Sequence, residues 1–443
     1  MRDAAPIVAR VTPPAMSGVG IIRVSGAEAL HLSRPLCVDL PEEVEPRRAY
    51  FTSIGAPDIV DQGLFLYFRG PHSFTGEDVV EFHLHGSPVG LQMLLAQLLG
   101  RGARLAGPGE FSRRAFINGR IDLAKAEAIA DLIAAKSESA VKAAAAQLKG
   151  NVSQAIGELT RMLLDLQVDL EGSLNFPEEA EGSDAGIEER LSELLERLQQ
   201  ATAQAQRGVL LRRGGKVVLF GPSNAGKSSL FNALTGEPRA LVDEEPGTTR
   251  DSLHAELNLK GLPVTLVDTA GLRDHPTRIE ALGIERTRQS IEGADLVLVV
   301  VPAAATAEER APWCGQAGKA LQLRIASKAD LSSPSQRDSM DVSWLKVSAT
   351  TGEGVDFLKD KIADQLWDQG APEAVVFSSE RHADALKRAS QALTRASGAF
   401  VRSTTEVVAG EVSLAVEALS EITGGTNSES LLDGIFSKFC IGK

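Results

Sequence analysis

The chain is poor in cysteine, in long apolar runs and in targeting signals, and each shortage excludes a class of protein. Its 443 residues include three cysteines, Cys37, Cys314 and Cys440, which are too few and too scattered for a disulfide framework or a zinc site. No stretch approaches the ~18 uninterrupted apolar residues of a membrane-spanning helix. The N-terminus has neither an apolar signal core nor an Arg- and Ser-rich transit pattern. These absences predict a cytoplasmic protein with no membrane span.

Positive charge is also scarce. The chain carries 46 lysines and arginines against 59 aspartates and glutamates, a net charge of −13. Binding nucleic acid by bulk electrostatics needs clustered Lys and Arg, so this balance counts against it but leaves room for a local basic site. Apolar residues make up 43% and charged residues 24%, as is ordinary for a globular protein. The length predicts about three domains at roughly 150 residues each.

Four segments differ in their apolar pattern. Residues 1–118 mix Gly and Pro with short alternating runs such as Val79–His85, where period two predicts a half-buried strand. Residues 119–213 keep the spacing of long amphipathic helices. Residues 214–372 alternate strand-like and helical runs, as in a parallel α/β sheet, and helical spacing returns in 373–443. We therefore predict a multidomain protein: an α+β N-terminal domain and a discontinuous helical bundle into which an α/β domain is inserted.

A phosphate-binding motif opens the α/β segment. Gly221–Ser228 reads G-x-x-x-x-G-K-S and stands between the apolar run 216–220 and a helical pattern, which is the context that a P-loop requires. Its glycines let backbone N–H groups wrap phosphates at a helix N-terminus. Lys227 is expected to reach the β- and γ-phosphates, and Ser228 to bind Mg²⁺.

Further motifs follow in order along the chain. Gly247–Asp251 offers a Thr hydroxyl to the metal, and Asp268–Gly271 can hold a water on Mg²⁺. Asp330, which ends Ser327–Asp330, can accept hydrogen bonds from guanine N1 and N2 that adenine cannot supply. Ser348–Ala349 resembles the loop whose backbone contacts guanine O6. The set resembles the translation-factor class of GTPases and predicts a Ras-like P-loop GTPase domain. The predicted GTP-binding residues are Asn224, Ala225, Gly226, Lys227, Ser228, Ser229, Asp243, Glu244, Glu245, Pro246, Gly247, Thr248, Thr249, Asp268, Thr269, Ala270, Gly271, Ser327, Lys328, Ala329, Asp330, Ser348, Ala349 and Thr350.

Two positions depart from the usual GTPase motifs. Ser327 stands where Asn is usual in the guanine motif, which puts the strength of base binding in question. Leu272 follows the glycine of the Asp268 motif, where Ras-like enzymes carry a Gln that orients the attacking water, and a leucine cannot do so. The carboxylates Asp274 and Glu280, in the segment that follows, are the candidates for that task. The residue types and spacing alone favour neither of the two as the residue that orients the water.

Signatures outside the GTPase motifs extend from one end of the chain to the other. They are Thr12–Pro14, Gly20–Gly26, Ser73–Asp78, Pro108–Phe111, Ala124–Ile133 and the terminal Cys440–Lys443. With these signatures and the inserted GTPase, the chain resembles over its whole length the family of tRNA-modification GTPases called MnmE or TrmE. The resemblance implies that the N-terminal domain is similar to folate-binding domains.

The resemblance also implies a reaction and partners. MnmE-like proteins act on tRNA with a flavin-dependent MnmG-like FAD protein, in a heterotetramer, and install an aminomethyl or carboxymethylaminomethyl group at C5 of the wobble uridine. A tetrahydrofolate derivative, in its 5-formyl or methylene form, carries the one-carbon unit. The domain 1–118 would bind folate and form a homodimer, 119–213 and 373–443 would build the helical domain, and 214–372 the GTPase domain. The folate contacts implied by matching position are Arg23, Glu81, Arg120 and Lys443.

A K⁺-dependent mechanism follows from the same resemblance. In the family, K⁺ stands in the place of an arginine finger and offsets charge between the phosphates of GTP. Glu280 matches the glutamate that orients water, and Cys440 belongs to the modification site. The implied catalytic residues are Lys227, Glu280 and Cys440. The implied metal ligands are Ser228 and Thr249 for Mg²⁺, and Asn224, Asp243, Glu245 and Thr248 for K⁺.

Two other interpretations are possible. An Era-like ribosome-assembly or signalling GTPase would usually carry a basic RNA-binding appendage, and no segment of this chain is net basic. A GTPase joined to a purely structural scaffold is the third interpretation, and the terminal Cys-Ile-Gly-Lys argues against it. His83 and His85 share a strand face and are too few for a Zn²⁺ site, so they are interpreted as a polar lining of the folate pocket.

Overall fold

The chain divides into two compact units, each of which is described by itself. The computed structural model describes residues 5–135, 137–175, 184–236, 253–268, 291–314, 320–333, 341, 343–367, 377, 379–400, 404–425 and 429–442. The first unit comprises 1–130, 147–197 and 388–443, and the second comprises 131–146 and 198–387. The domain boundaries at 118, 213 and 372 stay predictions. None of the helices in these ranges combines the length and the hydrophobicity that a membrane span needs.

A six-stranded sheet of order β3-β4-β5-β2-β1-β6 opens the first unit. Its neighbouring strands are antiparallel, except that β1 and β6 are parallel. The predicted strand at 79–85 is confirmed, since Val80, Phe82 and Leu84 are buried on one face while Glu81 and His83 lie half-buried on the other. The strands are β1 (Ile7–Arg10), β2 (Ser17–Ser25), β3 (Ala49–Ile54), β4 (Asp61–Phe68), β5 (Val79–Gly86) and β6 (Arg104–Leu105).

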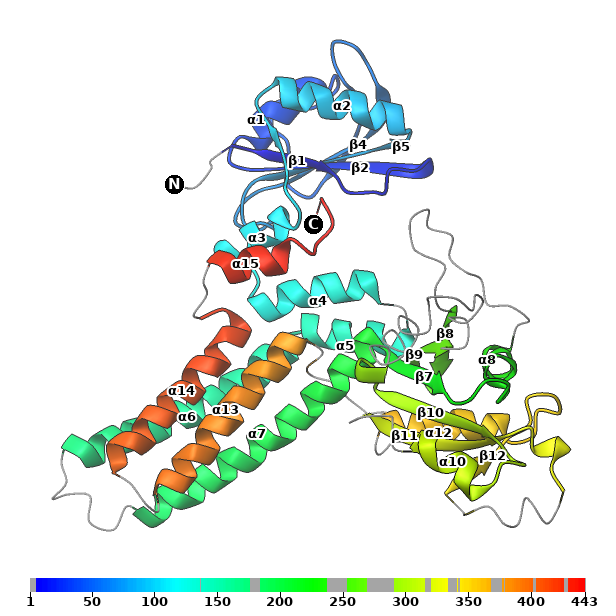
Figure 1. Ribbon diagram of the computed structural model, residues 1–443. Helices are drawn as coiled ribbons and strands as arrows, with labels where there is room; N and C mark the ends of the chain where they lie inside the picture. The colour runs from blue at the N-terminus through cyan, green and yellow to red at the C-terminus, as the bar shows by residue number, and fades with distance from the viewer. Residues whose placement is uncertain are drawn as a thin grey trace, which may run out of the picture. The chain divides into compact units, whose positions relative to one another are not determined.

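Two helices cover the apolar face of this sheet (Figure 1). They are α1 (Ala29–Ser33) and α2 (Pro88–Gly100), and Leu91, Leu94 and Leu98 of α2 share a core with the inward side chains of β2, β4 and β5. The hydroxyl of Ser87 accepts a hydrogen bond from the Gly90 amide, which fixes the start of α2. The opposite face carries the polar side chains and meets α3 (Glu110–Ile117).

The predicted amphipathic helices are confirmed. In the first unit α6 (Asn151–Asn175) packs along α14 (Thr405–Thr423), as Figure 1 shows. Arg388 and Arg395 of α13 (Glu380–Phe400) pair with Glu421 and Glu411 of α14. The other helices of the helical segments are α4 (Leu123–Ala134), α5 (Glu138–Leu148), α7 (Asp184–Arg213) and α15 (Glu429–Phe436).

A second six-stranded sheet, of order β12-β11-β10-β7-β9-β8, forms the centre of the second unit. All its neighbours are parallel except β8 and β9. The strands are β7 (Gly215–Phe220), β8 (Leu253–Leu259), β9 (Leu262–Asp268), β10 (Leu296–Pro302), β11 (Leu321–Ser327) and β12 (Trp344–Lys346), and the helices beside them are α8 (Lys227–Thr235), α10 (Ala307–Cys314) and α12 (Val355–Trp367).

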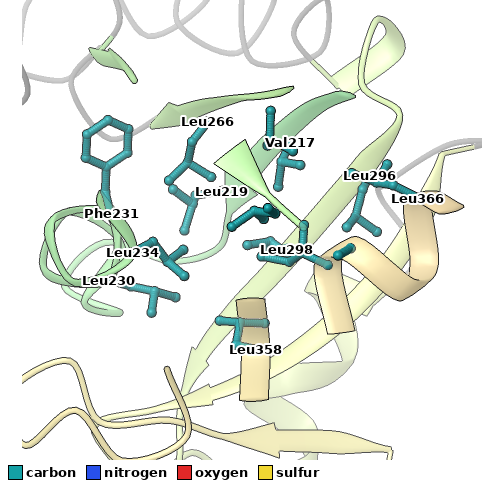
Figure 2. Close-up of a cluster of buried hydrophobic side chains, with 14 of the residues drawn as sticks. Val217, Leu219, Leu230, Phe231, Leu234, Leu266, Leu296, Leu298, Leu358 and Leu366 are labelled. Carbon is teal, nitrogen blue, oxygen red and sulfur yellow. The ribbon is translucent and has the colours of Figure 1, made fainter. Parts of the chain in front are cut away.

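Both faces of this sheet are buried, as parallel strands require. Figure 2 shows one of the two cores: Val217, Leu219, Leu266, Leu296 and Leu298 of the strands meet Leu230, Phe231 and Leu234 of α8 and Leu358 and Leu366 of α12. On the other face Val218, Val297 and Val299 pack with Trp313 of α10. The continuous apolar runs at 216–220 and 296–301 are therefore confirmed as central strands.

The antiparallel edge strand β8 differs from the wholly parallel sheet that the sequence predicts. β8 and β9 form a hairpin joined by Lys260 and Gly261, both of which have positive φ (52° and 86°). Two such residues match the turn that suits the twist of a tight hairpin. The side chain of Asn258 accepts a hydrogen bond from the Gly261 amide and helps to fix this turn.

Candidate functional site: a P-loop and a polar sheet face

The loop between β7 and α8 has a conformation that its glycines make possible. Gly221 has φ +151°, and a Cβ atom there would stand 2.0 Å from the carbonyl oxygen of Val300. Gly226 has φ +85° and immediately precedes α8. Side chains at these two positions would collide or strain the backbone. The loop can therefore lie close to the sheet and direct the first amides of α8 toward one point, as a phosphate site requires.

Lys227 lies across this loop. Its side chain is buried (6% exposed), and its ammonium group donates to the carbonyl oxygens of Gly221 and Pro222 at 2.9 and 2.7 Å. A charged ammonium in this position holds the loop closed by hydrogen bonds of the strong, charge-assisted kind. The same ammonium group is the one that the sequence predicts to contact the phosphates.

Ser228 and Asp268 come together from different elements. The Ser228 hydroxyl, in the first turn of α8, donates to Oδ2 of Asp268 at 2.7 Å, and Asp268, the last residue of β9, is fully buried. Oxygen ligands of this kind are those that Mg²⁺ prefers, with waters completing its shell. The structure thus brings together two of the residues predicted around the metal.

The predicted guanine motif lies beside the P-loop. Ser327, the last residue of β11, donates to the carbonyl oxygen of the P-loop residue Ala225. Lys328 has φ +54°, and its Cε lies 3.6 Å from the position that a Cβ of Gly226 would occupy. A cavity of about 110 Å³ is lined by Gly226, Ser229, Leu230, Ser327, Lys328, Asp330, Leu331, Val347, Ala349 and Thr350. Seven of these ten are predicted GTP-binding residues. Leu230 and Val347 were not predicted because they are ordinary buried core residues, and Leu331 because an exposed apolar residue carries no binding signal in the sequence.

A second polar cluster lies on the sheet of the first unit. Nε of Arg23 donates to Oε1 of Glu81 at 2.8 Å, and Nε2 of His83 lies 2.9 Å from Oε2 of the same carboxylate. The Arg23 guanidinium also stands 5.8 Å from the ring centre of Phe74 and 5.7 Å from that of Phe111, as in a cation–π contact. Two predicted folate contacts therefore adjoin each other. The two phenyl rings beside Arg23 belong to the signatures Ser73–Asp78 and Pro108–Phe111 but were not predicted as part of the site.

The charge state of Glu81 follows from these neighbours. Burial raises the pKa of Glu81, but the hydrogen bond with His83 and the nearby Arg23 guanidinium lower it by more, so the pKa lies below its ordinary value. Glu81 is thus a carboxylate at neutral pH. His85 instead pairs with Asp61 through Nδ1 at 2.9 Å and is largely exposed, so the two predicted lining histidines have different surroundings.

The C-terminal tail runs beside α3 and β1. Phe436 and Phe439 pack with Leu123 and Ala126 of α4. Ile441 forms an isolated antiparallel bridge with Pro108, which places Cys440 next to the loop that precedes α3. Cys440 is exposed, whereas burial raises the pKa of the Cys37 thiol to about 12. Cys440 is therefore more accessible to a reactant than Cys37.

Comparisons with known proteins account for the whole chain. A sequence model of the MnmE helical domain matches residues 123–440, and one of the N-terminus of the GTP-binding protein TrmE matches 6–120. The tRNA modification GTPase MnmE of Myxococcus xanthus is 52% identical over 444 residues, which cover 99% of this chain and 98% of that protein. The chain belongs to the MnmE family of tRNA modification GTPases. MnmE of Chromobacterium violaceum is 42% identical over 449 residues, 99% of this chain and 98% of that protein.

Two solved structures of GTPases resemble a part of the chain. A single-residue variant of Era from Aquifex aeolicus, bound to GDP and AlF4⁻, is 22% identical to this chain. The match covers 40% of this chain and 66% of the Era chain, with a TM-score of 0.29. The G domain of the FeoB iron transporter of T. maritima is 25% identical. The match covers 34% of this chain and 98% of that domain, with a TM-score of 0.27. Scores this low add nothing to the assignment to the MnmE family, which rests on the full-length sequence match.

Several predicted residues of this MnmE-family site lie outside the described part of the chain. These are Asp243, Glu244, Glu245, Pro246, Gly247, Thr248, Thr249, Thr269, Ala270, Gly271, Asp274, Glu280 and Lys443. The structure does place Asn224, at φ +60° and exposed at the tip of the P-loop. It also places Arg120, which is exposed and has its Cγ 3.1 Å from the position that a Cβ of Gly76 would occupy.

Proposed function

We propose that this chain is a K⁺-activated GTPase that works in the modification of the tRNA wobble uridine, in the cytoplasm and together with an MnmG-like FAD protein. The observation that carries the proposal is a closed P-loop, with Lys227 across it and Ser228 on Asp268, in a chain that matches MnmE relatives over 99% of its length. This match, extending well beyond the GTPase sheet, favours the proposal over an Era-like function.

The lack of a water-orienting Gln supports a dependence on K⁺. Leu272 cannot orient the attacking water, so other residues must do so, and Glu280 is the proposed one. Asn224 presents an exposed amide at the P-loop tip, and its oxygen is of the kind that ligates a monovalent cation. A bound K⁺ would offset the charge that develops between the phosphates, in the way that an arginine finger does. Asp243, Glu245 and Thr248 are proposed as its further ligands, and Thr249 with Ser228 as ligands of Mg²⁺.

The choice of cation tests this part of the proposal. The turnover number for GTP should be at least about tenfold higher in K⁺ than in Na⁺ at equal ionic strength. An arginine finger in the same place raises the turnover number by a factor of about 10³–10⁵. Equal turnover in the two salts would contradict the K⁺ mechanism. Mg²⁺ and GTP are held saturating so that the ratio reports the chemical step.

The polar face of the N-terminal sheet is the proposed folate site. Its residues fit the ligand, since the Glu81 carboxylate is ionised and can accept hydrogen bonds from a pterin edge, while Arg23, Arg120 and Lys443 can neutralise a glutamyl tail. A bound tetrahydrofolate derivative would supply the one-carbon unit. Arg23 and Glu81 hold each other in place, and the tail holds Cys440 beside α3. Cys440 is proposed to act in the modification step.

Large exposed apolar side chains in the first unit support a homodimer formed by the N-terminal domain. Met16 is 89% exposed, Phe51 68% and Val89 70%. Apolar surface of this kind is what protein–protein contacts bury. We propose the MnmG-like partner and the tRNA substrate together with this dimer. Because the chain is acidic, many of the contacts with the tRNA phosphates would be made by the partner.

Calorimetry with 5-formyltetrahydrofolate tests the folate site. The full-length protein should bind one molecule per protomer, and Arg23→Ala should abolish or greatly weaken binding because the glutamyl tail and the Glu81 carboxylate both lose their cation. Arg48→Ala, at an exposed arginine that pairs with Glu45, is the matched control and should bind like the wild type. Absence of binding to the wild-type protein would contradict the folate assignment.

A further inference from the structure

The serine that replaces asparagine in the guanine motif has a defined position. Ser327 is 4% exposed, and its hydroxyl lies 2.5 Å from the carbonyl oxygen of Ala225 and 3.2 Å from that of Val301. Ala225 belongs to the P-loop and Val301 to β10. The hydroxyl thus joins the P-loop to the edge of the sheet at which β10 and β11 end.

The number of protons on this side chain decides what else it can bind. A serine hydroxyl has one proton to donate, whereas an asparagine amide has two. Both groups near the Ser327 hydroxyl are carbonyl oxygens, which only accept. The proton is therefore used on the main chain, and the side chain keeps no donor for a base. An amide at the same position could donate to the Ala225 carbonyl and still have an N–H for a ring nitrogen.

The adjoining cavity brings residue 327 and Asp330 to one site. Asp330 and Ser327 both line the cavity of about 110 Å³, with Lys328, Ala349 and Thr350. A carboxylate accepts hydrogen bonds, so Asp330 suits the N1 and N2 groups on the Watson–Crick edge of guanine. The ring nitrogen N7 lies on the other side of the purine and is an acceptor, which needs a donor.

From this geometry we infer that N7 of a bound guanine receives no hydrogen bond from residue 327, whose hydroxyl instead anchors the P-loop, so that base recognition is left to the contact predicted above for Asp330. The inference rests on the proposed GTP site and deepens it. Guanine binding is accordingly weaker by one hydrogen bond than an asparagine would allow. The anchor acts on the phosphate-binding loop and so affects every nucleotide alike.

A nucleotide that lacks N7 tests the inference. In 7-deaza-GDP a C–H group replaces N7, so the full-length wild-type protein should bind GDP and 7-deaza-GDP with dissociation constants within about twofold in calorimetry with Mg²⁺. Ser327→Asn supplies the second donor, and it should bind GDP about three- to tenfold more tightly than 7-deaza-GDP, as expected for one hydrogen bond. A wild-type preference for GDP of more than about fivefold would overturn the inference, as would equal ratios in the wild type and Ser327→Asn.

Two further variants separate the anchor from a general structural effect. Ser327→Ala leaves the Ala225 carbonyl without this donor, so it should weaken GDP and 7-deaza-GDP by the same factor. Ser332→Ala is the control: Ser332 is also buried and donates to a main-chain carbonyl, that of Ala329, which lies outside the P-loop. It should leave both dissociation constants unchanged. A loss confined to GDP in Ser327→Ala would overturn the inference, whereas failure of the wild type to bind GDP at all would contradict the proposed function itself.

Discussion

The hydroxyl of Ser228 donates a hydrogen bond of 2.7 Å to the carboxylate of Asp268. The two residues are 40 positions apart and belong to α8 and β9, so only the parallel pairing of β7 with β9 and the turn into α8 bring them together. Both residues are predicted to act at Mg²⁺, and Ser228 directly follows Lys227 in the chain. The contact gives the first prediction.

Ser228→Ala removes one oxygen from the proposed magnesium site. The Mg²⁺ concentration for half-maximal GTP hydrolysis should rise by at least about 10-fold. Removing the hydrogen-bond partner of a metal ligand already lowers metal affinity by about 10- to 100-fold. A magnesium titration of steady-state hydrolysis measures it. Thr235→Ala, at the opposite end of the same helix, is the control and should behave like the wild type, because Thr235 bonds the Asn232 carbonyl within α8. An unchanged magnesium requirement in Ser228→Ala would contradict the assignment.

Asn224→Ala tests the cation site. Loss of the exposed amide should reduce turnover in K⁺ to the wild-type level in Na⁺, while the dissociation constant for GDP stays within about threefold because the P-loop amides and Lys227 still hold the phosphates. Hydrolysis assays in the two salts, with GDP calorimetry alongside, give both numbers. If Asn224→Ala kept the full K⁺ stimulation, the ligand would have to be another residue.

Phe439→Ala tests the role of the tail. Phe439 is buried and lies 5.4 Å from Phe436, ring centre to ring centre, and truncating a buried Phe costs about 3–5 kcal/mol. The tail should then separate from α3, so amide hydrogen exchange at 106–110 should rise and tRNA modification should fall. GTP hydrolysis should not change, since its residues belong to the other unit.

The exposed phenyl group of Phe357 offers the matched control for this experiment. It is 55% exposed on α12, so Phe357→Ala should alter neither exchange at 106–110 nor modification. Normal modification by Phe439→Ala with a demonstrably detached tail would mean that Cys440 acts without this docking of the tail.

Glu81 predicts a dependence of local stability on pH. Its pKa is lowered in the folded protein by His83 and Arg23, which outweigh burial, so its contribution is present above the unfolded-state pKa and is lost as the pH falls through the lower, folded-state value. At neutral pH, Glu81→Gln should destabilise the β2–β5 pair by about 1–3 kcal/mol, as expected when hydrogen bonds to a charged group are lost. The difference between the two proteins should shrink below about pH 4.3, where an unperturbed glutamate becomes protonated.

Hydrogen exchange of the β2 and β5 amides, corrected for the intrinsic rate at each pH, measures this difference. Glu45→Gln is the control: the Glu45 side chain is exposed and, within the described part of the chain, pairs with its neighbour Arg48, so the variant should match the wild type at every pH. A Glu81→Gln difference that stayed constant from pH 7 to pH 3 would show that the charge of Glu81 does not stabilise the sheet.

The sequence predicts those parts of the architecture that leave a pattern in neighbouring residues. The P-loop glycines and the strand before them predict both the motif and its place, and the alternation of Val80, Phe82 and Leu84 predicts the buried face of β5. The prediction for 214–372 rests on continuous apolar runs and so misses the edge strand β8, although Leu253, Ala255, Leu257 and Leu259 alternate with polar residues, which is itself a strand pattern. β11 is missed in the same way, since Gln322 and Arg324 alternate with Leu321, Leu323 and Ile325 and leave no continuous apolar run.

Contacts between distant segments could not be predicted from the sequence. The unit with the GTPase sheet also takes in 131–146, because Ala143 of α5 enters its core and Ser139 donates to the carbonyl of Gly261 in the hairpin turn. Short polar and small side chains of this kind have no periodic signature. For the same reason the motif gives no sign that Ser327 anchors the P-loop, because in the motif the serine is only a departure from asparagine.

Mass spectrometry of tRNA nucleosides tests the central claim most directly. A strain that lacks this protein should lose the aminomethyl-type group at C5 of the wobble uridine, and expression of the wild-type chain should restore it. Glu280→Ala should not restore it, although it should still bind GTP, because hydrolysis drives the modification. Unchanged wobble-uridine modification in the strain that lacks the protein would contradict the account.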